Sequence, residues 1–197
     1  MGWIMDYLDI EKILNAFNLQ LEKIGKKLEI IVCGGSALSI IGLVKRVTKD
    51  IDVLAFVEKT DGHFKIVRAD FPGWLKEVIS KIARDFGLPQ NWMNPGPTSL
   101  VDLGLPEGLE DRLIKRNYGD NLTVYYVSRF DQIHFKLYAS VDRGGYHVDD
   151  LLELKPTSEE LEAAARWSMT HDVSEGYRNV LKHLLKRLGY DDVAKRI

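Results

Sequence analysis

Cysteine is nearly absent from this sequence. Cys33 is the only one among 197 residues, so an intramolecular disulfide and a zinc site built on several thiolates are both excluded. Such sparing use of cysteine is typical of proteins in a reducing cytoplasm, where we expect this chain to act. Cys33 itself ends an aliphatic run and is predicted to be a small buried apolar residue.

Long apolar runs and a secretory leader are missing as well. No stretch approaches the roughly 20 apolar residues that span a bilayer. The opening residues, MGWIMDYLDIEK, lack a basic segment and reach acidic residues at once, which is not the pattern of a signal peptide. We therefore expect a soluble protein that does not associate with membranes.

A strong charge of either sign is also lacking. Lys and Arg number 27 against 29 Asp and Glu, which gives a formal net charge of -2. This near-balance argues against a protein that binds nucleic acid through bulk charge, although it leaves room for a local basic patch. Hydrophobic residues still make up 45% of the chain, which is enough for a core without disulfides or a structural metal.

The common nucleotide-binding and hydrolase motifs are absent. The segment GGSALS is not followed by the Gly-Lys-Ser or Gly-Lys-Thr of a P-loop. It does not fit the G-x-G-x-x-G pattern of dinucleotide-binding folds, and it lacks the second glycine of the G-x-S-x-G hydrolase turn. These three classes of protein are therefore excluded as explanations of the segment.

The apolar pattern that is present predicts strands alternating with helices. Dense aliphatic runs of strand length cover residues 28–33, 50–57 and 122–127. Helical spacing predicts helices over residues 5–25, 73–88, 107–117 and 129–143. Beyond these, from residue 147, only helical patterns follow. This order favours an α/β (α+β) fold, with a small sheet flanked by helices and a C-terminal helical section.

No shift in composition marks a linker in the chain. We expect a core over residues 1–155, including the first helix, and a helical section over residues 156–197 that packs on it. The segment from Pro89 to Pro106 is rich in Pro, Gly and Asn and is predicted as a long loop, a type that is often functional. Trp92 in this loop is interpreted either as part of a base or acceptor pocket or as a plug over the core.

A glycine pair joins the first predicted strand to a short helical pattern. Gly34 and Gly35 permit a tight turn and let a ligand approach the backbone closely. Ser36 is predicted as the N-cap of the helix that follows. Unpaired N–H groups and the positive end of the helix dipole at such a point suit phosphate oxygens. Taken alone, however, such a turn is most often only a turn.

Asp50 and Asp52 lie at the start of the second predicted strand. Because they flank a single strand residue, both side chains are expected on the same face of the strand. Two carboxylates on one face offer hard oxygens that suit Mg²⁺ or Mn²⁺ together with substrate phosphates. The alternative for the pair alone is a solvated strand end. Combined with the glycine turn, it favours a metal site across a cleft from bound phosphates.

These residues together resemble the signature of the minimal nucleotidyltransferases of the polymerase-β-like superfamily. The pattern GGSAL, followed by R-x-T-x-DID and an aliphatic run, is nearest to that of AbiEii-like, toxin-related prokaryotic proteins. The later segment KLYASVDRGGYHVDDLLEL resembles the second part of that pattern. The matching residues are Gly34, Gly35, Ser36, Arg46, Thr48, Asp50, Asp52, Lys136, Arg143, Asp150 and Leu151.

The resemblance implies a fold and a reaction. The fold would be a small mixed sheet of the nucleotidyltransferase type. An NTP would lie with its triphosphate against Gly34, Gly35 and Ser36, while Asp50 and Asp52 would hold one or two Mg²⁺ ions. The nucleotide would join a hydroxyl of RNA or a protein, and pyrophosphate would leave. The same branch implies an antitoxin or toxin partner.

Two basic residues are assigned to the nucleotide by the same resemblance. Arg46 or Lys136 would neutralise charge on the triphosphate. The alternative for Arg46 is a partner of the aspartate pair that offsets the repulsion between the two carboxylates. The alternative for Lys136 is a solvated side chain on an amphipathic helix.

Active members of the superfamily carry a third carboxylate on a later strand, and the predicted strand 122–127 has none. Asp102, Asp149 and Asp150 are the candidates. Asp150 is predicted as the third catalytic residue, because it matches an Asp-Leu pair in the resemblance. Without such a residue, the alternative is a catalytically weakened protein that binds nucleotide or acts as an antitoxin-like partner.

A basic stripe marks the last long helical pattern. Arg178, Lys182 and Lys186 recur every four residues, with His183 and Arg187 beside them. A stripe of this kind could follow a phosphate backbone. The alternative is the solvated face of a surface helix.

Overall fold

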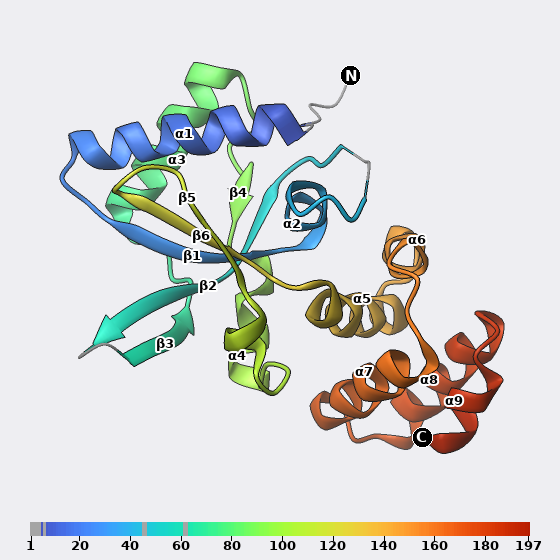
Figure 1. The fold of residues 1–197 in the computed structure, drawn as a ribbon. Coiled ribbons are helices and arrows are strands. Elements are labelled where there is room, and N and C mark those ends of the chain that lie inside the picture. Colours follow the sequence, from blue (N-terminus) through green and yellow to red (C-terminus); the bar gives the residue numbers. More distant parts are fainter. Residues whose placement is uncertain (1–4, 6, 45–46, 61–62) are drawn as a thin grey trace. The chain divides into compact units, whose positions relative to one another are not determined.

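The computed structural model of the protein describes residues 5, 7–44, 47–60 and 63–197. A six-stranded sheet and a series of helices make up this described chain (Figure 1). The strands are β1 (Leu28–Cys33), β2 (Ile51–Thr60), β3 (His63–Arg68), β4 (Met93–Asn94), β5 (Ile114–Asn117) and β6 (Leu122–Tyr126). The helices are α1 (Tyr7–Lys23), α2 (Gly34–Ile40), α3 (Gly73–Phe86), η1 (Gly96–Ser99), α4 (Leu100–Leu103), η2 (Leu109–Arg112), α5 (Arg129–Asp142), α6 (Tyr146–Glu153), α7 (Ser158–His171), α8 (Glu175–Arg187) and α9 (Asp191–Arg196).

The sheet is mixed. Its order is β3-β2-β1-β6-β5, and β4 pairs with β2 off this path. Strand β1 pairs antiparallel with β2 and parallel with β6, while β3 and β5 add antiparallel pairs at the two edges. The predicted fold class is thereby confirmed, as a small mixed sheet flanked by helices and followed by a C-terminal helical section.

Helices α1 and α3 pack on one face of the sheet (Figure 1). The core there is formed by apolar side chains of both helices and by alternate residues of β1, β2 and β6. In β2, Ile51 and Val53 belong to this core. Because side chains alternate along a strand, Asp50 and Asp52 point to the opposite face. The strand pattern thus brings two carboxylates together on the face away from α1 and α3.

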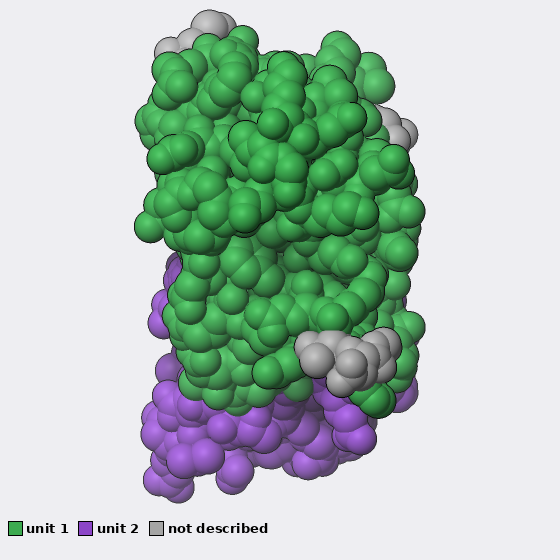
Figure 2. Space-filling model, turned by 90° about the vertical axis from the view of Figure 1, so that its left-hand side faces the viewer, with its two compact units in different colours: residues 1–105, 110–127 green, residues 106–109, 128–197 purple. Residues whose placement is uncertain are grey.

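The chain divides into two compact units, coloured separately in Figure 2. Unit 1 comprises residues 1–105 and 110–127 and contains the sheet. Unit 2 comprises residues 106–109 and 128–197 and contains α5 to α9. The sequence predicts a boundary at residue 155. The compact units instead divide after residue 127, because α5 packs with α6 and α7.

Three local features differ from the predictions. The helix predicted over residues 107–117 is wrong, because this segment forms η2 and then β5, whose pairing with β6 overrides a weak helical pattern. Ser36 is not an N-cap: α2 already begins at Gly34, with Cys33 as the N-cap residue and no side-chain cap hydrogen bond. Strands β3 and β4 lie in segments for which the sequence pattern predicts no strand.

The helical section predicted over residues 156–197 consists of α7, α8 and the short α9. Thr157 and Glu160 form a reciprocal capping box at the start of α7. The hydroxyl of Ser174 accepts from a backbone N–H at the start of α8. In the part of the chain that the structure describes, no helix combines the length and the apolar character needed to cross a bilayer.

Candidate active site

The glycine turn and the aspartate pair meet where β1 ends and β2 begins. Cys33, the last residue of β1, lies opposite Asp52 in the antiparallel register. Gly34 follows with a φ of 72°, in the left-handed region that favours glycine. A Cβ atom at this position would lie 2.6 Å from Oδ2 of Asp52. Glycine is therefore needed at position 34 both for its backbone conformation and for the close approach of the carboxylate.

Asp50 and Asp52 converge on one amide side chain. Asn94 donates from Nδ2 to Oδ1 of Asp52 at 3.2 Å and, over a longer 3.5 Å, to Oδ2 of Asp50. Since one nitrogen reaches both carboxylates, the two side chains lie on the same face, as their spacing predicts. The backbone supports this arrangement, because β4 pairs parallel with β2 and sets Asn94 beside Asp52 in the register.

Asn94 is a site residue that the sequence alone does not reveal. Its only local signal is the turn-forming Asn94-Pro95-Gly96, within a segment predicted as loop. Strand β4 has two residues, too few for any alternation of polar and apolar side chains to be visible. Strand β4 pairs with β2, which is distant in the sequence, and this pairing places the amide of Asn94 beside the carboxylates.

The donor set of this cluster fits a divalent cation. Burial raises the pKa of the Asp50 carboxyl, and the nearby charge of Lys49 acts in the opposite direction. Two ionised carboxylates side by side in a partly desolvated place are unfavourable unless a cation or donor offsets them. Their converging hard oxygens suit Mg²⁺ or Mn²⁺, which also takes water and phosphate oxygens. Within the described part of unit 1, no group of three His, Cys, Asp or Glu side chains forms a fuller site.

The residues predicted to hold phosphate lie directly beside this cluster in the chain. Gly35 and Ser36 are buried in the first turn of α2. The hydroxyl of Ser36 has no hydrogen-bond partner among the described residues, so its donor and acceptor capacity is unused there. Arg46 lies outside the described residues. Nucleotide binding by Gly34, Gly35, Ser36 and Arg46 stays a prediction.

Comparison with known protein families bears on the same cluster. The model of a family described as a nucleotidyltransferase of unknown function (DUF6036) matches residues 9–155. The match takes in most of the chain, including both the glycine turn and the aspartate pair. The chain belongs to this nucleotidyltransferase family. No curated protein and no solved structure matches the chain.

Two further predicted site residues of this nucleotidyltransferase lie in unit 2. Lys136 in α5 donates from Nζ to Oδ2 of Asp150 in α6 at 2.6 Å, and only 6% and 2% of the two side chains are exposed. The ring of Tyr146 lies 5.9 Å from the same Nζ. The interpretation of Lys136 as a solvated side chain is therefore wrong. Catalysis by Asp150 and nucleotide binding by Lys136 stay predictions.

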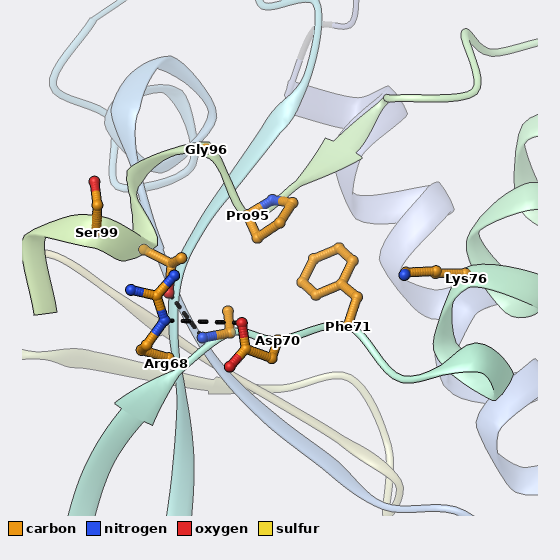
Figure 3. Close-up of a pocket in the computed structure, with 9 residues that line it drawn as sticks. Arg68, Asp70, Phe71, Lys76, Pro95, Gly96 and Ser99 are labelled. Atoms are coloured by element: carbon orange, nitrogen blue, oxygen red, sulfur yellow. Dashed lines mark hydrogen bonds and ion pairs between the residues drawn. The ribbon is translucent and has the colours of Figure 1, made fainter. Parts of the chain in front are cut away.

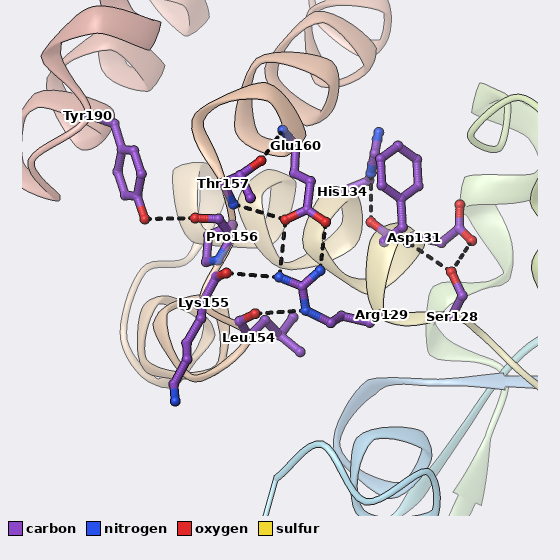
Figure 4. Close-up of polar contacts among 11 residues, drawn as sticks. Ser128, Arg129, Asp131, His134, Leu154, Lys155, Pro156, Thr157, Glu160 and Tyr190 are labelled. Carbon is purple, nitrogen blue, oxygen red and sulfur yellow. Dashed lines mark hydrogen bonds and ion pairs between the residues drawn. The ribbon is translucent and has the colours of Figure 1, made fainter.

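Arg129 fixes the connection between α6 and α7 in unit 2 (Figure 4). It donates to the carbonyl oxygens of Leu154 at 2.9 Å and Lys155 at 2.8 Å, and to Oε1 of Glu160 at 2.6 Å. Lys155 is the one non-glycine residue of the described chain with a positive φ, 48°. Burial alone would raise the pKa of Glu160, but hydrogen bonds from Arg129 and from the N–H of Thr157 outweigh it and hold that pKa below 4.5.

A cavity of about 570 Å³ in unit 1 is lined by residues between positions 68 and 76 and by residues that come shortly after Asn94 in the chain (Figure 3). Pro95 and Gly96 line it, and the N–H of Gly96 donates to Oδ1 of Asn94 at 2.9 Å. Phe71 and Lys76 also line it, so an aromatic ring and an ammonium group share one opening. This combination is chemically suited to a group that carries both a base and a phosphate.

Three remaining features of the nucleotidyltransferase have structural explanations. Trp92 is fully buried and donates from Nε1 to the carbonyl oxygen of Ile79 at 3.0 Å, which confirms its interpretation as a plug over the core. Asp102 forms a surface ion pair with Arg68. Basic residues of α8 such as Arg178 are exposed, as on a solvated helix face, and nucleic-acid binding by this stripe stays a prediction.

Proposed function

We propose that this protein is a metal-dependent nucleotidyltransferase of the polymerase-β-like type, which moves a nucleotide from an NTP to a hydroxyl of RNA or a protein. The observation that carries the proposal is the convergence of Asp50 and Asp52 beside Gly34. Two carboxylates next to a glycine turn offer a cation site and a phosphate site in one place. Membership of a nucleotidyltransferase family supports the same reaction class.

In the proposed reaction, the acceptor oxygen forms a bond to the α-phosphorus of the NTP. The bond from that phosphorus to the β-phosphate oxygen breaks, and pyrophosphate leaves. The acceptor hydroxyl gives up its proton to a base or to water. A bound Mg²⁺ would supply charge neutralisation at the phosphates. Asp50 and Asp52 would hold the cation, while the backbone at Gly34 and Gly35 and the hydroxyl of Ser36 would bind triphosphate oxygens.

Unit 2 is given two roles in this proposal. Lys136, like Arg46, would neutralise triphosphate charge, and Asp150 would be the third catalytic carboxylate. One observation favours a second candidate function, because Lys136 and Asp150 are bound to each other and almost fully buried. A chain in which this pair stays closed would bind nucleotide without transferring it. Such a protein would act as a nucleotide-binding or antitoxin-like partner, in keeping with the AbiEii-like resemblance.

The cavity beyond Asn94 supports RNA as the acceptor class. The ring of Phe71 would stack on a base, and Lys76 would pair with a phosphate of the same strand. Phe71→Ala is expected to weaken binding of the acceptor RNA while leaving NTP binding unchanged. A loss of NTP binding in that variant would instead assign the cavity to the nucleotide.

A transfer assay tests the proposed function. Wild type, Asp52→Asn and Asp85→Asn are incubated with Mg²⁺, each NTP labelled at the α-phosphate, and cellular RNA or protein. Asp85 is an exposed aspartate on α3 that pairs with Lys81, so it controls for the loss of a charge. Label should pass to an acceptor in wild type and Asp85→Asn but not in Asp52→Asn. Nucleotide binding without transfer would select the second candidate, and neither binding nor transfer would contradict both.

A further inference from the structure

The side chain of Asn94 is held from two directions. Its strand β4 is paired with β2, where Asn94 lies beside Asp52, and the N–H of Ile51 donates to the carbonyl oxygen of Trp92 at 2.6 Å. On the other side, Oδ1 of Asn94 accepts from the N–H of Gly96 at 2.9 Å. A Cβ on Gly96 would lie 2.8 Å from that oxygen. A side chain at position 96 would therefore displace the amide oxygen of Asn94.

This anchoring decides which end of the amide faces the carboxylates. Because Oδ1 is bound by Gly96, the Nδ2 donors face Asp50 and Asp52. Ionised carboxylates only accept hydrogen bonds, so a donor is the group that matches them. A flipped amide would set a third acceptor against the two carboxylates and leave the N–H of Gly96 facing a donor. The hydrogen-bond network therefore permits one orientation.

We propose that Asn94 is a positioning residue of the site: its amide holds Asp50 and Asp52 together when no cation is bound, and it limits the cluster in unit 1 to two negative charges. The inference rests on the proposed function, because its consequence is measured through binding of a divalent cation. In unit 1, the strand beside the aspartates thus carries a neutral amide where a carboxylate would complete an anionic triad.

A neutral third group changes stability and cation affinity in opposite directions. With two carboxylates instead of three, the site has less self-repulsion in the absence of a cation. It also attracts a divalent cation less strongly, since affinity rises with the number of charged ligands. If Asn94 were merely structural, its replacement would lower stability and cation affinity together. A positioning role therefore predicts opposite changes in stability and cation affinity when Asn94 becomes a carboxylate, whereas a structural role predicts that both fall.

The substitution Asn94→Asp tests this directly. Aspartate has nearly the same shape, keeps an acceptor for the N–H of Gly96, and replaces the donor by a charged oxygen. Mn²⁺ binding is measured by the electron paramagnetic resonance signal of free Mn²⁺, and the thermal midpoint is measured in EDTA. We expect Asn94→Asp to raise Mn²⁺ affinity about tenfold and to lower the midpoint by about 2–4 °C. The double variant Asp52→Asn/Asn94→Asp restores two carboxylates and should recover the midpoint.

The other outcomes separate this inference from the proposed function. If Asp52→Asn abolishes Mn²⁺ binding but Asn94→Asp changes neither quantity, the role of Asn94 is overturned and the proposed function stands. If Asn94→Asp lowers both quantities, Asn94 is a structural residue and the inference is overturned as well. If neither wild type nor Asn94→Asp binds Mn²⁺, the proposed function fails, and the inference falls with it.

Discussion

Two pairs of charged side chains, one in each unit, differ in the sign of the charges they bring together. In unit 2, Lys136 and Asp150 carry opposite charges, lie 2.6 Å apart and are almost fully buried. In unit 1, Asp50 and Asp52 carry the same charge, are partly exposed and share the neutral donor Asn94. An opposite-charge pair satisfies itself, whereas a like-charge pair retains repulsion that a bound cation would relieve. The comparison identifies the aspartate pair as the arrangement that a bound cation would stabilise, and therefore as the one that is informative about function.

The largest effect is expected from breaking the buried pair in unit 2. Lys136→Met removes the ammonium group that donates to the buried Asp150 carboxylate, and should lower the free energy of unfolding by about 3–5 kcal/mol. The double variant Lys136→Met/Asp150→Leu removes both charges and should recover most of that loss. Urea denaturation followed by circular dichroism measures both. Equal destabilisation of the single and double variants would contradict the view that the charges mainly satisfy each other.

The next effect is expected at the glycine turn of unit 1. Gly34→Ala forces a side chain into the left-handed region, at about 1–2 kcal/mol, and also displaces the Asp52 carboxylate. Gly42→Ala is a matched control, because Gly42 has a φ of 75° but nothing within 4 Å of its ideal Cβ. Both variants should lose stability in urea denaturation, but only Gly34→Ala should lose Mn²⁺ binding. Loss of Mn²⁺ binding in both would mean that backbone strain alone disturbs the site.

A smaller effect, of opposite sign, is expected at the aspartate pair itself. Asp52→Asn removes one of two like charges and should raise the free energy of unfolding in EDTA by up to about 1 kcal/mol. Asp150→Asn in unit 2 should lower it, because the buried Lys136 then loses its counter-charge. Thermal unfolding of the wild type and the two variants in EDTA measures whether each substitution raises or lowers stability. A stability loss in Asp52→Asn would show that this carboxylate stabilises the fold.

The smallest effect concerns the half-buried ion pair of Arg129 and Glu160. Because folding lowers the pKa of Glu160 below 4.5, its ionised form contributes stability above that value, and the contribution is lost as the pH falls through the folded pKa. Near neutral pH, the free energy of unfolding of the wild type should be higher than that of Glu160→Gln by less than about 1 kcal/mol. The difference should shrink in urea titrations below pH 4.5. A pH-independent difference would point to packing and not to charge.

The sequence predicts the long buried strands of unit 1 but does not predict the exposed strands at the edges of the sheet. Strand β1 falls on residues 28–33 as predicted, because a dense aliphatic run is unambiguous. The edge strands β3 and β5 are mostly exposed and rich in charged residues, so they show no clear alternation of apolar side chains. An Asp-Gly pair at positions 61–62 precedes β3 and is a hairpin signal present in the sequence.

The candidate site is predictable to the extent that it lies on those long strands. Gly34, Asp50 and Asp52 follow from the turn and the strand period, and the structure brings them together. Asn94 does not follow, because its place is set by tertiary pairing of a two-residue strand. The ion pair of Lys136 and Asp150 does not follow either, because no local spacing rule joins residues on two successive helices.

Calorimetric titration of each NTP, with and without Mg²⁺, tests the central claim that Asp50 and Asp52 form a cation-dependent nucleotide site. The titration compares wild type with Asp52→Asn and with the surface control Asp85→Asn. The account predicts Mg²⁺-dependent binding of an NTP by wild type and Asp85→Asn, and its loss in Asp52→Asn. Equal binding by wild type and Asp52→Asn, or no binding of any NTP at millimolar concentration, would contradict it.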